Sequence, residues 1–311
     1  MAKPRNKVID YIAYVAARAA VMTLHALPPA ATYEAARAAA WLICRFDRLH
    51  WGRAVGHLER SFADWPPQRV ARVARASIRS MICMFLEALW TPRLIQPHRW
   101  RRHVRLRHMP DVIRLMVERK QPAVMITGHF GNWEVVGYTM AAVGLPSYTV
   151  ARHIDNPHLD AFVFGVREKA GQRMIYKKGA ARQVAQAMHS ASIVCFVGDQ
   201  DAGRKGIHVD FFGRKASTFK SIALMAMEYR TPLVVAGCRR LGDAFRFEIF
   251  VQRTIDPREW HGRDDPVAWI TQEYTAALEQ MARSCPEQYF WVHRRWKHRP
   301  QGEARPADGI A

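Results

Sequence analysis

Residues 123–134 have the sequence AVMITGHFGNWE, in which an apolar, β-branched run leads into a glycine-containing turn. A short apolar run of this kind predicts a buried strand. Gly128 and Gly131 open the turn that follows, and Asn132 is placed to cap the apolar helix beyond it. The stretch therefore predicts a strand–turn–helix unit of an open α/β sheet, a fold in which ligands bind at the carboxyl ends of strands.

His129 and Glu134 are five residues apart in this stretch. On one continuous helix they would point away from each other, but across a strand-to-helix turn they can converge. A carboxylate that orients and polarises an imidazole is the arrangement of a general base with its partner acid. The alternative is a structural histidine near a glutamate. The position after a strand favours the catalytic interpretation, with both residues as catalytic candidates.

The remainder of the chain alternates strand and helix signals. Apolar strands are predicted near 146–151, 172–176, 192–198, 232–238 and 245–251, with helices at about 132–143, 157–170, 179–190, 217–229 and 265–283. Such alternation predicts an α/β fold with a central, mainly parallel sheet flanked by helices. We expect an N-terminal membrane-associating helical segment (1–46), an α/β domain (47–300) and a flexible tail (301–311).

The N-terminal segment places Lys3, Arg5 and Lys7 before a largely apolar run over residues 8–27. Asp10 and Arg18 interrupt that run, which argues against a signal peptide and against an ordinary transmembrane helix. An amphipathic or shallowly inserted membrane anchor fits better, and a soluble helix packed on the core is the alternative. A second, alanine-rich helix is predicted over residues 30–46.

The composition is strongly basic, with 47 Lys and Arg against 27 Asp and Glu and a net charge of +20. This favours anionic partners, namely phospholipid surfaces, phosphorylated glycolipids, acidic carrier proteins or nucleic acid. Residues 99–108 are densely basic, and 101–107 are predicted to form an edge strand with a cationic face that suits nucleic acid, a membrane or solvent. The five cysteines and fourteen histidines show no metal-ligand spacing, so we expect no metal and no cofactor.

Arg152 follows the predicted strand 146–151, which makes it a candidate to bind a phosphate or a developing oxyanion. Asn156, before Pro157, is either a substrate contact or part of the turn that begins the next helix. The loop Gly198-Asp199-Gln200-Asp201-Ala202-Gly203 follows strand 192–198. Its two aspartates suit a divalent metal or the shaping of a loop by hydrogen bonds, and we favour the second role because no third carboxylate is nearby.

Two later segments combine aromatic and cationic residues. The segment 211–218 (FFGRKAST) is suited to line an acyl chain and meet an anionic headgroup, although a buried Phe pair is usually core. The block 286–300 (PEQYFWVHRRWKHRP) contains paired arginines, which suit bidentate contact with phosphate or carboxylate.

The His129-x4-Glu134 motif resembles that of lysophospholipid-type acyltransferases. Together with Arg152, Asp155-Asn156-Pro157, the 199–203 loop and the 286–300 block, it resembles the lipid A biosynthesis (lauroyl/myristoyl) acyltransferases over about residues 8–302. The resemblance implies a glycerolipid-acyltransferase-like fold, an inner-membrane location with the catalytic domain facing the cytoplasm, an acyl carrier protein as donor and an anionic glycolipid as acceptor. The substrate-binding residues that it implies are Asn132, Asn156, Asp199, Gln200, Asp201, Gly203, Arg294, Arg295 and Lys297.

The resulting hypothesis is an O-acyltransferase. His129 deprotonates an acceptor hydroxyl as it attacks an acyl thioester, Glu134 stabilises the imidazolium, and Arg152 or N–H groups of residues 131–134 bind the oxyanion. The absence of a G-x-S-x-G elbow fits direct transfer. Three alternatives are an enzyme that uses acyl-CoA or acylates a phosphatidylinositol mannoside or ornithine lipid, a nucleic-acid-binding protein, and a membrane scaffold with a decayed site. We expect no nucleic-acid partner.

Overall fold

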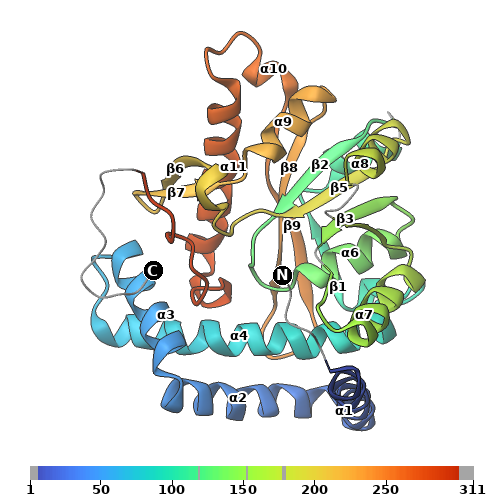
Figure 1. Ribbon diagram of the computed structural model, residues 1–311, viewed down its shortest axis with the longest axis vertical. Coiled ribbons are helices and arrows are strands. Elements are labelled where there is room, and N and C mark those ends of the chain that lie inside the picture. Colours follow the sequence, from blue (N-terminus) through green and yellow to red (C-terminus); the bar gives the residue numbers. More distant parts are fainter. Residues whose placement is uncertain (1–5, 118–119, 152, 177–179, 301–311) are drawn as a thin grey trace.

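The computed structural model describes residues 6–117, 120–151, 153–176 and 180–300, and Arg152 and the tail 301–311 lie outside them. Figure 1 shows a central sheet with helices on both faces and a layer of long helices beneath it. The elements are α1 (Lys7–Ala26), α2 (Pro29–Phe46), α3 (Arg48–Ser61), α4 (Pro67–Leu94), β1 (Val104–Arg107), α5 (Pro110–Val117), β2 (Ala123–Thr127), α6 (Trp133–Ala142), β3 (Ser147–Ala151), α7 (Pro157–Lys169), β4 (Arg173–Tyr176), α8 (Ala180–His189), β5 (Ile193–Val197), β6 (Ile207–Phe211), β7 (Arg214–Thr218), α9 (Lys220–Glu228), β8 (Leu233–Arg240), β9 (Phe247–Ile255), α10 (Pro257–Trp260) and α11 (Pro266–Ser284).

The central sheet has seven strands in the order β1-β9-β8-β2-β5-β3-β4. Strands β8, β2, β5, β3 and β4 run parallel to one another, whereas β9 is antiparallel to β8 and β1 runs parallel to β9. The predicted α/β class and mainly parallel sheet are confirmed. The predicted cationic edge strand is β1, which has a sheet neighbour on one side.

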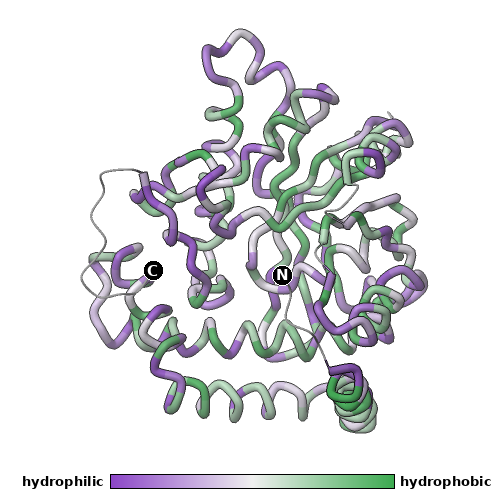
Figure 2. Tube along the Cα trace, in the orientation of Figure 1, coloured by the Kyte–Doolittle hydropathy of each residue, from purple (hydrophilic) through white to green (hydrophobic). Residues whose placement is uncertain are grey.

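Alternate side chains of the central strands enter two separate hydrophobic cores, as expected for a sheet covered on both faces. Val124 and Ile126 of β2 pack on one face with α9 and α11. Ala123 and Met125 pack on the other face with α6. Figure 2 shows these central strands as the most continuously hydrophobic part of the chain. The sheet is thereby held rigid, and its carboxyl-terminal edge can position side chains.

The N-terminal helices lie at one end of the molecule, with α2 alongside α4 and α1 against α7 (Figure 1). Tyr33 and Ala36 of α2 are buried against Cys83 of α4. Among the described residues, α1 is the one helix with the length and composition to cross a membrane. Its apolar side chains are largely exposed, with Val8 at 65% and Met22 at 68%, so α1 presents an apolar surface outward.

One predicted helix begins later than expected. Residues 214–218 form β7, which pairs with β6 in a hairpin, and α9 begins at Lys220 instead of residue 217. The two-residue turn places both Phe212 (φ 52°) and Gly213 (φ 67°) in the left-handed region, as a type I′ turn requires. Phenylalanine is an unusual residue there, so the usual hairpin signal is missing from the sequence. Phe211 and Phe212 are core residues, which corrects the interpretation of 211–218 as an acyl-chain wall.

Candidate active site

His129 and Asp199 lie opposite each other just beyond two neighbouring parallel strands. Strands β2 and β5 pair with Thr127 opposite Val197, and each continues through a glycine into an ionisable residue. The His129 backbone N–H donates to Asp199 Oδ2 at 2.7 Å, and His129 Nδ1 is 2.6 Å from Asp199 Oδ1. Gly128 permits this approach, since a Cβ there would lie 3.0 Å from Asp199 Oδ2. The sheet register thus builds an imidazole–carboxylate pair.

The Asp199 carboxyl group is fully buried yet ionised. Burial opposes its ionisation, but attraction to His129, the two hydrogen bonds from His129 and attraction to His293 outweigh burial and hold the pKa of Asp199 well below its ordinary value. An ionised carboxylate accepts the Nδ1–H proton of a neutral imidazole. The unprotonated nitrogen is then Nε2, whose neighbour is the Gln200 side-chain amide nitrogen at 3.2 Å. This arrangement leaves a lone pair on Nε2, so that His129 can act as a base through this nitrogen.

The prediction that Glu134 orients the imidazole is wrong in this structure, because Asp199 makes that contact. Glu134 is the second residue of α6 and forms a bidentate pair with Arg167 of α7, with Arg167 Nε 2.9 Å from Oε2 and Nη2 bonded to Oε1. The Glu134 side chain is directed toward α7 because the turn ends at Asn132 and the helix then carries Glu134 away from the strand end. Its carboxylate stays at the edge of the site, where it lines two cavities.

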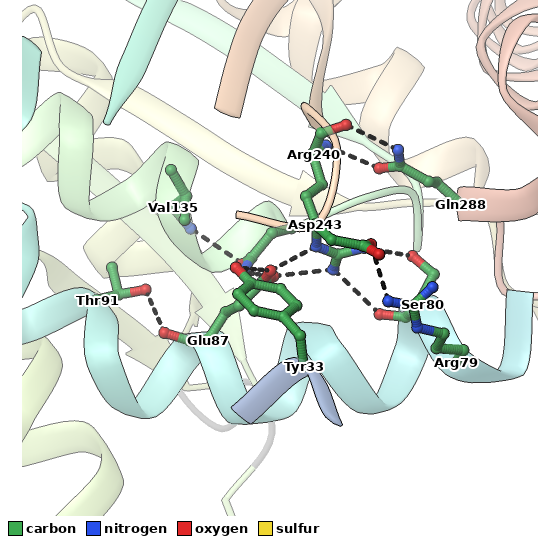
Figure 3. A network of polar contacts seen from close by, with 10 residues as sticks. Tyr33, Arg79, Ser80, Glu87, Thr91, Val135, Arg240, Asp243 and Gln288 are labelled. Atoms are coloured by element: carbon green, nitrogen blue, oxygen red, sulfur yellow. Dashed lines mark hydrogen bonds and ion pairs between the residues drawn. The ribbon is translucent and has the colours of Figure 1, made fainter. Parts of the chain in front are cut away.

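A buried network, shown in Figure 3, fixes the turn between His129 and α6. Glu87 of α4 is 1% exposed and accepts hydrogen bonds from Tyr33, Arg240 and Asn132. Burial opposes the charge on Arg240, but Glu87 outweighs burial and raises the pKa of Arg240. Gln288 joins the network through two bonds to the Arg240 backbone. Residues from α2, α4, β8 and the C-terminal block therefore meet at the turn.

Asn132 has the capping role that the sequence predicts, since its Oδ1 accepts from Val135 N and its side chain is fully buried. The neighbouring backbone N–H groups are already engaged: Gly131 N donates to Gln288 O and Asn132 N to Cys238 O. Gly131 has φ +55°, and a Cβ there would lie 1.8 Å from Cys238 O. The prediction that the N–H groups of 131–134 bind an oxyanion is therefore restricted to Trp133 and Glu134, in the first turn of α6, where N–H groups lack intrahelical partners.

A large apolar cavity of about 720 Å³ lies beside this turn. Its walls come from α1, α4, α6 and α7, and include Met22, Phe85, Leu89 and Val166. His129 itself lines a small cleft of about 10 Å³ that shares Met84 and Trp133 with the cavity. Trp133 packs edge-on against the His129 ring at 4.8 Å between centroids. The cavity volume falls within the range of small-molecule sites, roughly 300–1,000 Å³.

The rest of the 199–203 loop is held in place by its own hydrogen bonds. Asp201 accepts from Gly203 N at 3.1 Å and contacts His298 Nδ1 at 2.6 Å, which is the loop-shaping role favoured from the sequence. Gly203 has φ +74° and accepts from Ser217 Oγ. Besides Asp199, Gln200 of this loop reaches the imidazole with its side chain. Asp201 and Gly203 therefore support the loop without contacting His129.

The two adjacent arginines of the C-terminal block, Arg294 and Arg295, differ in their exposure and in their partners. Arg295 is 1% exposed and donates to Ser217 O and Thr218 Oγ1, so its predicted substrate contact is replaced by a structural one. Arg294 and Lys297 are exposed. His293 is a site residue for which the sequence predicts no role. Its ring centroid lies 6.1 Å from that of His129, and its Nε2 lies 3.1 Å from Asp199 O. Burial lowers the pKa of His293.

Asn156 is also a capping residue. Its Oδ1 accepts from His158 N and Leu159 N at the start of α7, and its Nδ2 donates to Asp10 O of α1. Asn156 is 5% exposed, so it joins α7 to α1 instead of facing a substrate. The predicted role of Arg152 concerns a residue outside the described part of the chain.

Comparison with known proteins shows which family this chain belongs to. Residues 2–298 match the family described as bacterial lipid A biosynthesis acyltransferase. The chain is 24% identical over 253 residues to the lipid A biosynthesis lauroyltransferase of Escherichia coli K12, covering 79% of this chain and 78% of that protein. It is 28% identical over 191 residues to the palmitoleoyltransferase of the same strain, covering 58% of each. It is 26% identical over 212 residues to the phosphatidylinositol mannoside acyltransferase of Mycolicibacterium smegmatis, covering 65% of each. Because the family match spans almost the whole sequence, the chain belongs to the bacterial lipid A biosynthesis acyltransferases and is an acyltransferase.

Proposed function

We propose that the protein transfers a fatty acyl chain from an acyl thioester, carried by acyl carrier protein, to a hydroxyl group of a lipid A precursor at the cytoplasmic face of the inner membrane. The observation that carries this proposal is the His129–Asp199 pair beside a large apolar cavity. Family membership supports acyl transfer to a lipid. The exposed apolar face of α1 and the net charge of +20 support work at an anionic membrane.

The base in this reaction is Nε2 of His129. Asp199 accepts the Nδ1 proton, which fixes the tautomer with a free lone pair on Nε2 and stabilises the imidazolium that forms. The acceptor hydroxyl takes the place beside Nε2 that the Gln200 amide now occupies at 3.2 Å. As the hydroxyl oxygen attacks the thioester carbonyl, its proton moves to Nε2. The proton then passes to the leaving thiolate, so no covalent acyl-enzyme is required.

The oxyanion formed in this step needs preorganised hydrogen-bond donors. The N–H groups of Trp133 and Glu134, at the N-terminus of α6, are the candidates in the described turn, since Gly131 and Asn132 already donate elsewhere. Arg152 is proposed as a second donor, on the strength of its position after β3 in the sequence. Glu134 is proposed to act through Arg167 by holding the start of α6 against α7.

The acyl chain of the donor is proposed to occupy the 720 Å³ cavity. Trp133 contacts the His129 ring and lines the cavity, so a chain whose carbonyl lies at His129 can pass Trp133 directly into it. The apolar wall contributed by Val21 and Met22 of α1 makes the N-terminal helix part of this site. Removing α1 should therefore impair catalysis even when the reaction is run in detergent.

A second acceptor has a specific observation in its favour. The 26% identity to a phosphatidylinositol mannoside acyltransferase supports a mannosylated phospholipid as the alternative acceptor, with the same base and cavity. The shared requirement is a hydroxyl group on a large anionic lipid.

The test is a mass-spectrometric transfer assay. Full-length protein is incubated with a lipid A precursor or a phosphatidylinositol mannoside, and with acyl-carrier-protein or acyl-CoA donors of several chain lengths. A gain of one acyl chain on the lipid A precursor, fastest from the carrier protein, supports the proposal. A gain on the mannoside alone supports the second acceptor. No gain with any pair, from folded protein, contradicts both.

A further inference from the structure

A cavity of about 220 Å³ lies on the face of the sheet that α6 covers, and the proposed reaction gives it no role. Strands β1, β2 and β9 contribute one side of it, and α6 and the segment 109–113 at the start of α5 contribute the other. We call it the methionine cavity, after Met109, Met125 and Met140 in its lining. None of its described lining residues lines the cavity of about 720 Å³ beside His129. The methionine cavity is therefore separate from the proposed acyl-chain site.

The lining of the methionine cavity is apolar and adaptable. All three methionines are buried, and methionine side chains are flexible and polarizable, so they can adjust to a flexible apolar ligand. Cavities with apolar walls stay dry and take up small apolar molecules. A group of the size of a water molecule takes about 30 Å³, so the cavity volume of about 220 Å³ holds about seven such groups. This volume fits an alkyl chain of about seven carbons.

One hydroxyl group in this lining lacks a partner. Thr139 of α6 lines the cavity and is 2% exposed, and its Oγ1 makes no hydrogen bond within the described chain. A threonine hydroxyl in a helix can donate to the carbonyl one turn earlier. Four other helical threonines make this bond, each to the carbonyl four residues before it, namely Thr23, Thr91, Thr271 and Thr275. The Thr139 hydroxyl departs from this pattern, so a polar atom of a bound ligand would supply the missing partner.

A cation and two exposed apolar side chains mark the mouth of the methionine cavity. Ile113 is 39% exposed and Val143 is 37% exposed, although both line the cavity. Arg101 is exposed and also lines it, with its guanidinium 5.4 Å from the centre of the Trp100 ring. Arg101 belongs to the densely basic segment 99–108, to which the proposed reaction gives no role. Positive charge beside the mouth of an apolar cavity favours a ligand with an apolar chain and an anionic end.

The order of residues along α6 places the hydroxyl between the mouth and the interior. Val136, Thr139 and Val143 are three and four residues apart, so they lie on one side of the helix. Val143 at the mouth is about 6 Å along the axis from Thr139. Val136, in the other direction, is buried. A carboxylate that contacts Arg101 at the mouth can therefore reach the Thr139 hydroxyl while its chain extends inward.

We propose that the methionine cavity binds a medium-chain fatty acid of about eight carbons, with its carboxylate at Arg101 and Thr139 and its chain among the methionines. A carboxylate accepts hydrogen bonds from a guanidinium and a hydroxyl group at once, and its bond to arginine is charge-assisted. An alcohol of the same length fills the cavity but gains no charge-assisted bond. Binding requires no turnover, so this site can exist whether or not the proposed reaction is correct.

The test is photo-crosslinking of the full-length protein in lipid nanodiscs, which avoids detergent chains that would compete for the cavity. A diazirine analogue of octanoic acid is the probe, and mass spectrometry identifies the labelled peptides. We expect label in peptides from residues 100–113 or 136–145. Octanoate should displace the probe at a concentration about tenfold lower than 1-octanol does, because only octanoate pairs with Arg101.

Two variants remove the polar contacts one at a time. Thr139→Val removes the hydroxyl and keeps the side-chain shape, so it should weaken competition by octanoate about tenfold. Its thermal unfolding temperature should stay the same or rise, because a buried donor without a partner is removed. Arg101→Gln changes an exposed side chain and should weaken competition by about tenfold or more.

Thr275→Val and Arg102→Gln are the matched controls. Thr275 makes the usual helical bond in α11, and Arg102 is exposed next to Arg101 but does not line the cavity. Both should bind octanoate as the wild type does. His129→Gln should do the same, which separates this proposal from the catalytic one.

Three results would overturn the proposal. Displacement of the probe by 1-octanol and octanoate at equal concentrations would show that no carboxylate is recognised. Label confined to the wall of the larger cavity, or no label at all, would show that the methionine cavity takes no fatty acid. Unchanged competition in both Thr139→Val and Arg101→Gln, or equal losses in the two controls, would show that these side chains do not form the site.

Discussion

Replacing Asp199 by asparagine should remove most of the catalytic rate while leaving the fold in place. The asparagine Oδ1 can still accept from the His129 backbone N–H, as Asp199 Oδ2 does at 2.7 Å. Its amide nitrogen must then face His129 Nδ1, where a carboxylate oxygen now lies at 2.6 Å. The ring is thereby forced into the tautomer that carries its proton on Nε2, and the acceptor hydroxyl meets a donor instead of a base.

The size of this effect follows from the tautomer. An asparagine in place of a triad aspartate lowers kcat by about 10⁴ through the same change, which is about 5.5 kcal/mol of transition-state stabilisation. Stability should change much less, because one charge-assisted hydrogen bond becomes a neutral one, at a cost of about 1–2 kcal/mol. We therefore expect Asp199→Asn to lose about 10³–10⁴ in kcat with little change in KM for the donor.

The assay is acyl transfer under saturating donor and acceptor, with thermal unfolding of the same preparations as a check of the fold. Asp47→Asn is the control, since Asp47 pairs with His50 at the same Nδ1–oxygen distance of 2.6 Å on the exposed surface of α3. It should keep near-normal activity. A kcat for Asp199→Asn within tenfold of wild type would refute the assignment of Asp199 as the partner of the base.

Three further changes test other parts of the site. Ala88 lies in the cavity wall, and Ala88→Phe should lower kcat/KM for the longest accepted acyl donor, relative to a shorter one, by about tenfold or more. The ratio is measured by competition between the two donors. An unchanged ratio would place the acyl chain outside this cavity. The ion pair between Glu134 and Arg167 is tested by Glu134→Gln, Arg167→Gln and the double variant. All three should show similar losses of kcat/KM, because each breaks this same pair. Losses that add in the double variant would show that Glu134 acts separately from Arg167. Burial lowers the pKa of His57 to about 3 in the folded protein, below the pKa of about 6.5 in the unfolded chain. The stability that this residue contributes is therefore present above about pH 6.5 and is lost as the pH falls toward 3. About 2 kcal/mol should be lost between pH 7 and pH 5, seen in urea unfolding, and His57→Asn should flatten that dependence while preserving a donor to Trp291 O.

The predicted strands and most predicted helices follow from hydrophobic periodicity, so the α/β architecture and the position of His129 were accessible from the sequence. The partner of His129 cannot be predicted in the same way, because the motif that points to Glu134 is local in the sequence. Asp199 is 70 residues away and is brought to His129 by the pairing of β2 with β5. A signal was present: two apolar strands each end in a glycine followed by an ionisable residue, at Gly128-His129 and Gly198-Asp199.

Other site residues were misassigned because a motif does not show which way a side chain points. Arg294 and Arg295 are adjacent, yet one is exposed and the other is 1% exposed with backbone acceptors around it. Asn132 and Asn156 were correctly placed at helix starts, but each uses its amide nitrogen to join distant elements, α4 and α1 respectively. Such tertiary hydrogen bonds have no local sequence pattern. The cavity between α1, α4, α6 and α7 likewise depends on how four helices pack.

The central claim is that His129 is the general base of acyl transfer. The most direct measurement is the single-turnover rate from a saturating acyl thioester to the lipid acceptor, compared between the wild type and His129→Gln. The His129 side chain is largely buried beside Asp199, and glutamine is a polar side chain of similar size that can still donate to the Asp199 carboxylate, so the variant should fold and bind both substrates. We expect its transfer rate to fall by a factor of about 10³ or more. Transfer by folded His129→Gln within a few-fold of the wild-type rate would contradict the claim.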